Sequence, residues 1–419
     1  MTRPMLRIVH AADIHFDTPY RRHDEAVRAR LREAGREAFT RLIDLALERQ
    51  VDALLIAGDL FDNDLLTLAT ERVLVDELTR ATRAGLTVVY ATGNHDPGRA
   101  NYRAMGIDWP KERFHLVASR QPRQIAIERD GEVVGWVVAA GHQTPREDRD
   151  LAATFPPAPG PEPAVGLLHA QVMSARLAEQ HDRYAPAALD SLDPSYAYWA
   201  LGHIHQRQEV RPDPPVHYSG NVQGRQFGEV GAKGALVVTL ERGAAPEVEF
   251  EPLAPVRWET LEPEGLDEAR NLTHVHAAVS AAFNARRGDS PSDQEWILRV
   301  DLRGSSPLAP LLASEDERAE LAAQLREDLG VLDVEVRDRG LYRPVDIGAH
   351  RDQPHLLGQT LALLTRAATD DAALEGITPT ELAASQGGDA AERRDYLRDL
   401  LRDLDAEAAV RLLRESETA

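Results

Sequence analysis

The chain contains no cysteine among its 419 residues. This absence excludes a disulfide framework, a thiol nucleophile and any metal site built from thiolates. Any metal ion must therefore be bound by histidine, aspartate, glutamate or asparagine. The 15 histidines offer a large supply of imidazole ligands, so their placement matters more than their number.

Long apolar runs are absent as well. No stretch of the sequence reaches the roughly 20 apolar residues that span a bilayer. Met1–His10 carries two arginines but lacks the apolar segment and cleavage site of a signal peptide. We therefore expect a cytoplasmic protein that does not contact a membrane.

Lysine is scarce, and the 69 acidic residues outnumber the 48 basic ones. Lysine occurs only at Lys111 and Lys233, and the net charge is −21. This balance argues against a large, uniformly basic surface for nucleic acid, but it leaves room for a local basic groove or for bound cations. Arginine suits bidentate contacts with phosphate, although a biased base composition of the genome explains the preference for arginine more simply.

The first part of the chain alternates short apolar segments with amphipathic segments of helical period. Such alternation predicts βαβ units around a largely parallel sheet. The predicted strands are Leu6–Ala12, Asp52–Ala57 and Leu86–Ala91, and the predicted helices are Glu25–Arg49 and Leu65–Ala84.

From about Phe114 the predicted strands follow one another more closely, which indicates a second sheet packed on the first. A proline-rich loop, Pro156–Pro163, separates two of them. These strands are Gln124–Glu128, Val133–Ala139, Ala164–Leu168, Tyr198–Leu201, Val216–Ser219, Ala235–Leu240 and Val248–Glu251.

A boundary is expected around Pro252–Pro255, so that residues 1–254 form the first domain. Residues 255–345 have the pattern of a small βαβαβ domain, and residues 346–419 are helical and highly charged. One helix of this tail carries an apolar stripe that either covers its own domain or docks onto a partner. The stripe consists of Leu397, Leu400, Leu401, Leu404 and Ala408.

Five clusters of polar residues lie at the ends of predicted strands. Each cluster alone is commonly a turn or a polar strand edge, but sites in open α/β sheets form at the carboxyl ends of the strands. All five together therefore indicate one functional site. They are Asp13-Ile14-His15, Gly58-Asp59-Leu60-Phe61-Asp62, Gly93-Asn94-His95-Asp96, His169 and Gly202-His203-Ile204-His205.

The spacing within the clusters predicts convergence. Alternate residues of an extended chain point the same way, so Asp13 and His15 can face one point. Glycines such as Gly58 and Gly93 allow sharp turns and close approach of side chains. A ligand set of oxygen and imidazole suits Mn²⁺, Fe²⁺ or Zn²⁺.

The motif order D-x-H, G-D-x-x-D, G-N-H-D, H and G-H-x-H resembles the calcineurin-like metallophosphoesterase superfamily. The resemblance implies an α/β (α+β) fold, a two-sheet sandwich flanked by helices, and two divalent metal ions. It implies that Asp59 bridges both ions, that His95 sits beside the scissile phosphate, and that Asp62 holds His95 as in the protein phosphatases. The remaining implied ligands are Asp13, His15 and His205 for one ion, and Asn94, His169 and His203 for the other.

Finer features resemble the SbcD-type DNA-repair exonucleases, particularly their YhaO-like branch. These features are the opening His10–Pro19 and the segment Pro215–Arg225 after the double histidine. The resemblance implies DNA as substrate, exonuclease or endonuclease activity, and an SbcC-type coiled-coil ATPase as partner, with a homodimer left open. We expect Mn²⁺ ahead of Fe²⁺, Zn²⁺ or Mg²⁺. Arg225 and Arg207 are candidate phosphate contacts, and their alternative is ordinary surface arginine.

Two other functions remain open at this point. A phosphomonoesterase or a cyclic-nucleotide phosphodiesterase could use the same dimetal platform, although neither would need the long C-terminal part. A non-catalytic scaffold that binds DNA ends or an ATPase is the other alternative. The presence of every expected ligand, and of His95, argues against the scaffold.

Overall fold

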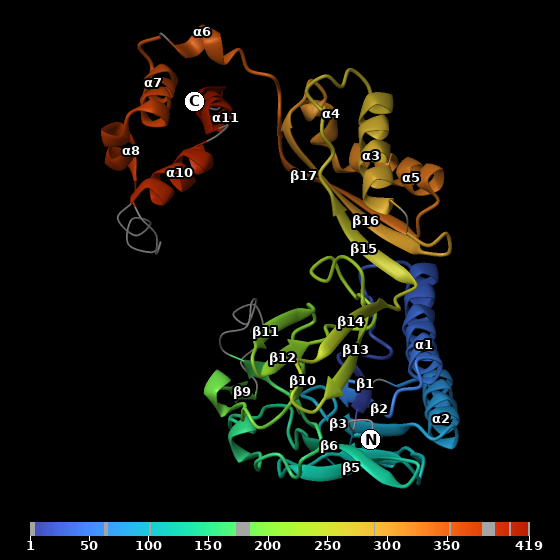
Figure 1. Cartoon of the computed structure of the whole chain (residues 1–419). Helices are drawn as coiled ribbons and strands as arrows, with labels where there is room; N and C mark the ends of the chain where they lie inside the picture. Colours follow the sequence, from blue (N-terminus) through green and yellow to red (C-terminus); the bar gives the residue numbers. More distant parts are fainter. Residues whose placement is uncertain are drawn as a thin grey trace. The chain divides into compact units, whose positions relative to one another are not determined.

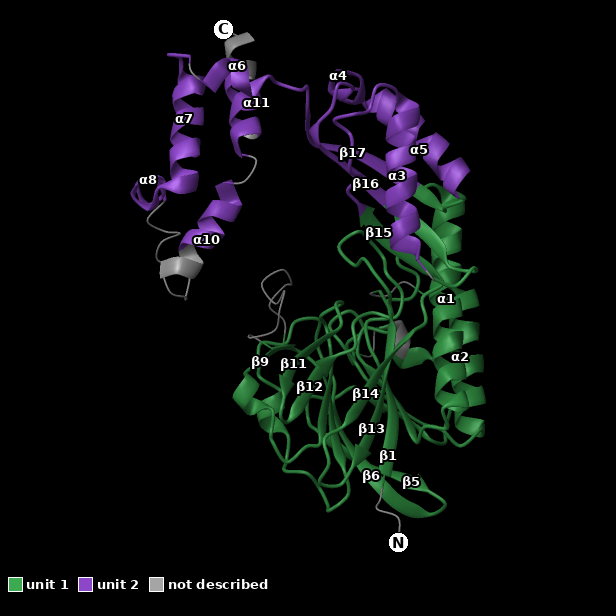
Figure 2. Ribbon diagram, turned by 45° about the horizontal axis from the view of Figure 1, so that its top comes forward, with its two compact units in different colours: residues 1–260, 289–298, 330–333 green, residues 261–288, 299–329, 334–419 purple. Residues whose placement is uncertain are grey.

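The structure is a computed structural model that describes residues 5–62, 66–99, 102–172, 185–288, 290–351, 353–378, 390–401 and 404–417. The chain divides into two compact units (Figure 2). Unit 1 comprises residues 1–260, 289–298 and 330–333, and unit 2 comprises residues 261–288, 299–329 and 334–419. The division into domains 1–254, 255–345 and 346–419 stays a prediction.

The first sheet of unit 1 has six strands in the order β14-β13-β1-β2-β3-β4 (Figure 1). The strands β1 to β4 are parallel, as the βαβ pattern predicts, and β13 and β14 are antiparallel. The bounds are β1 Met5–Ala11, β2 Ala53–Ala57, β3 Thr87–Ala91, β4 Phe114–Val117, β13 Gly234–Glu241 and β14 Glu247–Pro252.

The place of β13 and β14 corrects the sequence-based expectation, which put both strands in the second sheet. β13 pairs antiparallel with β1, with Ile8 opposite Val238. Without β13, the mostly buried strand β1 would expose a row of unpaired backbone groups at a sheet edge. An apolar alternation predicts a strand but does not say which sheet edge that strand will cover.

The second sheet of unit 1 has the order β11-β12-β10-β7-β6-β5. Its four central strands are parallel, and the edge strands β5 and β11 are antiparallel to their neighbours. The bounds are β5 Arg123–Arg129, β6 Glu132–Ala140, β7 Ala164–His169, β10 Tyr198–Gly202, β11 Gln208–Pro212 and β12 Pro215–Tyr218.

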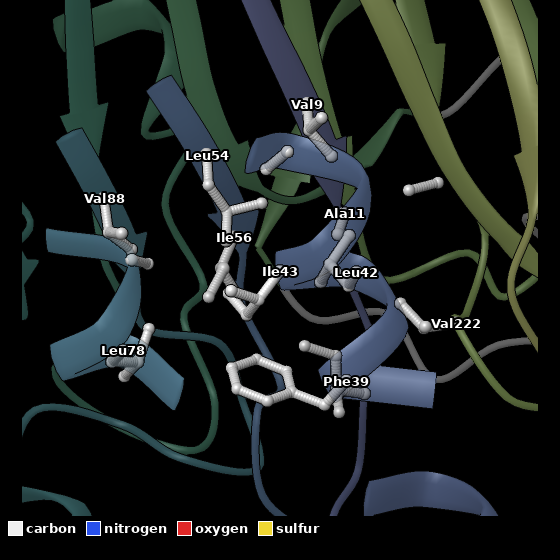
Figure 3. Close-up of a cluster of buried hydrophobic side chains, with 14 of the residues drawn as sticks. Val9, Ala11, Phe39, Leu42, Ile43, Leu54, Ile56, Leu78, Val88 and Val222 are labelled. Carbon is white, nitrogen blue, oxygen red and sulfur yellow. The ribbon is translucent and has the colours of Figure 1, made fainter. Parts of the chain in front are cut away.

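The core of unit 1 lies on both faces of the first sheet. On one face Leu55 of β2 packs in a buried cluster with Val165 of β7, so the two sheets form a sandwich. On the other face α1 (Glu25–Glu48) and α2 (Leu68–Arg83) cover the sheet, and Phe39 packs near Ile56 (Figure 3). Burying a large apolar side chain stabilises the fold by about 1.5–3 kcal/mol. The expected two-sheet sandwich flanked by helices is confirmed.

Beyond β14 the chain forms a three-stranded sheet, β15-β16-β17, and a group of helices, and a short two-stranded sheet joins β8 (Gln171–Val172) to β9 (Pro186–Ala187) earlier in the chain. α3 follows β15, and α4 and α5 follow β16, which is the βαβαβ order expected from the sequence. No helix within the described ranges is both long enough and apolar enough to cross a membrane. The bounds are β15 Val256–Leu261, α3 Leu272–Arg287, β16 Glu295–Ser305, α4 Ala309–Leu312, α5 Glu315–Leu329, β17 Asp333–Tyr342, α6 Ile347–Arg351, α7 Leu356–Thr369, α8 Asp371–Ile377, α10 Ala390–Leu401 and α11 Leu404–Glu417.

Candidate metal centre

The predicted ligands lie just beyond the carboxyl ends of strands in both sheets. Asp13 follows β1, Asp59 follows β2 and Asn94 follows β3, whereas His169 ends β7 and His203 follows β10. Backbone hydrogen bonds tie the first two loops together, because the amide of Asp13 donates to the Gly58 carbonyl at 3.1 Å. The pairing of β7 with β10 places Gly202 directly opposite His169.

The backbone at four of the predicted ligands is strained. Asp13 has φ 52°, His15 has φ 49°, Asp59 has φ 51° and His203 has φ 105°. Residues with a side chain rarely adopt such values, which cost on the order of 1–3 kcal/mol each and concentrate at functional sites. This geometry corrects the expectation of an extended Asp13–His15 segment: the side chains converge through left-handed turns, not by strand alternation.

Two glycines make room for predicted ligands. A Cβ atom on Gly58 would lie 2.3 Å from Nδ1 of His169, and one on Gly93 would lie 2.2 Å from Oδ1 of Asp59. Either contact is far shorter than van der Waals distance. These two glycines therefore allow a loop backbone to lie directly against a ligand side chain.

The contacts of His169 identify which of its ring nitrogens faces the site. Its Nδ1 lies 2.9 Å from the carbonyl oxygen of Ala57, so this nitrogen carries the proton and donates it. The lone pair is therefore on Nε2, which lies 2.9 Å from Oδ1 of Asn94 and 3.4 Å from Oδ2 of Asp59. Nδ1 of His203 lies 3.2 Å from the same Asn94 oxygen. Acceptor atoms gathered in this way fit a cation.

A second group of acceptors forms around His205. Its Nδ1 lies 2.8 Å from Oε1 of Glu229, which leaves the lone pair on Nε2. That Nε2 lies 3.3 Å from Nε2 of His15 and 3.8 Å from Oδ1 of Asp13. Nε2 of His15 is in turn 3.6 Å from Oδ2 of Asp59. Burial raises the pKa of Asp13, so its carboxylate needs a positive charge nearby.

The structure thus brings all seven predicted ligands together in two groups that share Asp59. The donor atoms are oxygens and imidazole nitrogens, which fit two divalent ions of the Mn²⁺, Fe²⁺ or Zn²⁺ kind. Which residue binds which ion stays a prediction. Donor atoms lie within 4.8 Å of one another in three sets, namely Asp13, His15 and His205; Asp13, Asp59 and His169; and His15, Asp62 and His95.

His95 lies beside this cluster and faces Asp62. Its Nδ1 is 3.1 Å from Oδ1 of Asp62, the contact that the hypothesis about this pair requires. The amide of His95 donates to Oδ1 of Asp59 at 2.9 Å, which fixes the loop. Burial alone would lower the pKa of His95, but the hydrogen bond to Asp62 and the charges of Asp59 and Asp62 raise it to about 9. The ring can therefore hold a proton near the cluster.

The two candidate phosphate contacts lie in different surroundings. The guanidinium of Arg225 is buried beside the ligands, with one nitrogen 3.1 Å from Nδ1 of His205 and 3.3 Å from Oε1 of Glu229. The guanidinium of Arg207 instead lies over the ring of Phe250, at 4.0 Å from its centroid. The structure therefore favours Arg225 over Arg207 as a residue of the site.

Sequence patterns did not assign a role to Glu229 or Lys233. Besides His205, the Glu229 carboxylate accepts from Nδ2 of Asn221 at 2.7 Å and from the amide of Arg225 at 2.8 Å. The buried Lys233 donates to the carbonyl of His205 at 2.9 Å. Both residues hold His205 from the loop between β12 and β13, and no ligand-type spacing from the double histidine signals them.

The fold and the cluster together define a two-sheet α/β protein with a site for metal ions. Residues 6–207 match the calcineurin-like phosphoesterase family. An uncharacterized metallophosphoesterase, YhaO of Bacillus subtilis, is 31% identical over 328 residues, which cover 77% of this chain and 78% of that protein. The chain therefore belongs to the calcineurin-like metallophosphoesterase family, whose members use a dimetal centre.

Two further relatives have names that refer to DNA repair or to a nuclease. The D component of the nuclease SbcCD from Rhodobacter capsulatus is 28% identical over 367 residues, covering 75% of this chain and 84% of that protein. The DNA double-strand break repair protein Mre11 of Methanopyrus kandleri is 26% identical over 272 residues. That match covers 60% of this chain and 57% of the archaeal protein.

Proposed function

We propose that this chain is the nuclease subunit of an SbcD-type DNA-repair exonuclease that works with an SbcC-type ATPase. The observation that carries the proposal is the convergence of seven predicted ligand side chains, with Asp59 shared between two groups and His95 beside them. The names of the relatives from Rhodobacter capsulatus and Methanopyrus kandleri support a nuclease of DNA repair.

The chain's own residues would hold the ions and the substrate. Asp13, His15 and His205 would bind one ion, Asn94, His169 and His203 the other, and Asp59 both. When bound, two divalent ions supply positive charge that activates water and stabilises the charge that develops on the phosphate. We expect Mn²⁺ to be the preferred ion.

His95 would then act on the leaving group. Its ring, held through Nδ1 by Asp62, would donate a proton from its other nitrogen to the departing sugar oxygen. Asp62 fixes the tautomer that this step needs, because the carboxylate accepts from Nδ1–H. Arg225 adds a positive charge near the phosphate, and Glu229 keeps that guanidinium in place.

The local charge is compatible with DNA despite the acidic chain. The predicted ligands include only two carboxylates, Asp13 and Asp59, against two divalent cations. The occupied site would therefore be positive and would attract a phosphodiester locally, whereas the net charge of −21 repels nucleic acid elsewhere.

A nuclease assay tests this proposal directly. End-labelled linear duplex and single-stranded DNA are incubated with the protein and Mn²⁺ or Mg²⁺, alongside a chromogenic phosphomonoester. We expect metal-dependent shortening of the DNA from its ends. Hydrolysis of the monoester without cleavage of either DNA would instead identify a phosphomonoesterase.

A further inference from the structure

A cavity of about 530 Å³ in unit 1 carries a concentration of arginine side chains. It is formed by the loop after β1 and by the first turns of α1, together with the segment that precedes α2. Arg21, Arg28 and Arg32 line it, together with Asp17, Glu25 and Thr67. We call these six residues the arginine pocket.

The arginine pocket lies next to the metal-ligand loop. Asp17 is only two residues beyond His15, and the hydroxyl of Thr18 donates to the His15 carbonyl at 3.0 Å. Burial raises the pKa of Tyr20 in the same loop, and the charges of Arg225, Asp62 and Arg32 all act on its phenol. Tyr20 is therefore close to charged residues of both the candidate metal centre and the arginine pocket.

Arginine charge exceeds carboxylate charge in this pocket. Asp17 is already engaged, because it accepts from the Thr67 amide at 2.6 Å and from the Thr70 hydroxyl at 2.8 Å. Glu25 is one carboxylate that contacts both Arg28 and Arg32. The exposed Arg21 forms no ion pair with the residues that the structure describes. Three arginines therefore line one cavity beside the loop that carries the predicted ligands Asp13 and His15.

We propose that the arginine pocket binds backbone phosphates of the nucleic-acid strand, a nucleotide or two from the bond that is cleaved. The inference rests on the proposed nuclease function and names its substrate subsite. Arginine guanidinium groups match phosphate in geometry and in charge. Leu68, next to Thr67, is 79% exposed and offers an apolar surface on which a sugar or base of the same strand can pack.

A binding assay tests the proposal without requiring cleavage. The anisotropy of a fluorescent single-stranded DNA oligonucleotide is measured in Ca²⁺ at several salt concentrations. The double variant Arg28→Ala, Arg32→Ala removes two phosphate contacts, so affinity falls about tenfold at moderate salt and the slope of log K against log salt decreases by about 1.4. The charge-preserving double variant Arg28→Lys, Arg32→Lys retains most of the affinity and the slope. Arg72→Ala, at a side chain of α2 that is 85% exposed, is the matched control and binds as the wild type does.

The outcomes distinguish failure of the arginine-pocket proposal from failure of the proposed nuclease function. If the double alanine variant bound DNA with unchanged affinity and an unchanged salt slope, Arg28 and Arg32 would be surface arginines only, and the inference would be overturned. The proposed nuclease function would still stand if the wild-type protein cleaved DNA. A wild-type protein that neither binds nor cleaves DNA would refute both. Unfolding temperatures of all variants, measured in parallel, identify any loss of binding that comes from misfolding.

Discussion

The carboxylate of Glu229 lies 2.8 Å from Nδ1 of His205, on the side of the imidazole away from His15 and Asp13. Hydrogen bonds from Asn221 and Arg225 hold Glu229 in turn. A carboxylate in this position keeps the proton on Nδ1, so that Nε2 presents its lone pair to an ion. Such partners orient metal ligands and raise their basicity.

Replacing Glu229 should therefore weaken metal binding. Because the neutral amide of a glutamine could not stabilise the Nδ1–H tautomer of His205 in the same way, Glu229→Gln is expected to lower Mn²⁺ affinity by about 10–100-fold. Titration calorimetry on metal-stripped protein measures the effect. Glu247→Gln, at an exposed position of β14, is the control. Equal Mn²⁺ affinities in the two variants would remove the role assigned to Glu229.

His95→Gln is expected to separate turnover from metal binding. The change removes the group that donates a proton to the leaving oxygen, so the rate of DNA hydrolysis should fall by about 10²–10⁴-fold. Mn²⁺ stoichiometry should stay at that of the wild-type protein, because His95 is not among the seven predicted ligands. Initial rates on labelled DNA, with calorimetry in parallel, give both quantities. If the variant cleaved DNA at the wild-type rate, His95 would have no catalytic role.

Gly93→Ala should disrupt the site more than the fold. The added Cβ would lie 2.2 Å from Oδ1 of Asp59 and must displace the carboxylate that both groups of ligands share. We expect loss of Mn²⁺ binding in a protein whose circular dichroism spectrum stays native. Gly35→Ala in α1 is the matched control, because nothing lies within 4 Å of its Cβ position. That change should stabilise the helix by about 0.5–1 kcal/mol, and a similar gain for Gly93→Ala would contradict the close packing proposed for the site.

His10 gives unit 1 a predicted sensitivity to acid. The ring is fully buried, with Nδ1 3.0 Å from the Tyr198 hydroxyl and Nε2 3.1 Å from the Leu201 carbonyl. Burial, with a contribution from His217, lowers its pKa from 6.5 to about 3. The unfolded chain therefore takes up a proton that the folded chain excludes, so His10 contributes stability that is present above pH 6.5 and is lost as the pH falls towards 3.

His10→Gln removes this titration. Between about pH 6.5 and pH 5.0 the wild-type protein should lose about 1.6 kcal/mol more free energy of unfolding than the variant, because the unfolded imidazole gains its proton over this range while the folded one stays neutral. Urea denaturation at the two pH values measures the difference. Equal losses of stability in both proteins would show that His10 titrates normally.

Sequence patterns predicted the candidate ligands but not the backbone geometry that brings them together. The strand ends predicted where Asp13, Asp59 and Asn94 would lie, because parallel strands bring their carboxyl ends to one edge. A D-x-H spacing is compatible with both an extended strand and consecutive left-handed turns. Only the hydrogen bonds to the loop at Gly58 and Asp59 decide between them.

Contacts between distant loops were beyond the reach of sequence patterns. Glu229 lies 24 residues after His205, and no periodicity relates the two. The edge position of β13 is similar, because its pairing with β1 depends on which strand of the first sheet would otherwise be left unpaired. Local patterns predict elements, whereas these relationships depend on the packed sandwich.

Anomalous diffraction from crystals grown with Mn²⁺ tests the central claim most directly. The account predicts two strong peaks roughly 3.5–4 Å apart, both in contact with Asp59. One peak should touch Asp13, His15 and His205, and the other Asn94, His169 and His203. A single peak, or two peaks that Asp59 does not join, would contradict the two-metal centre on which the proposed nuclease depends.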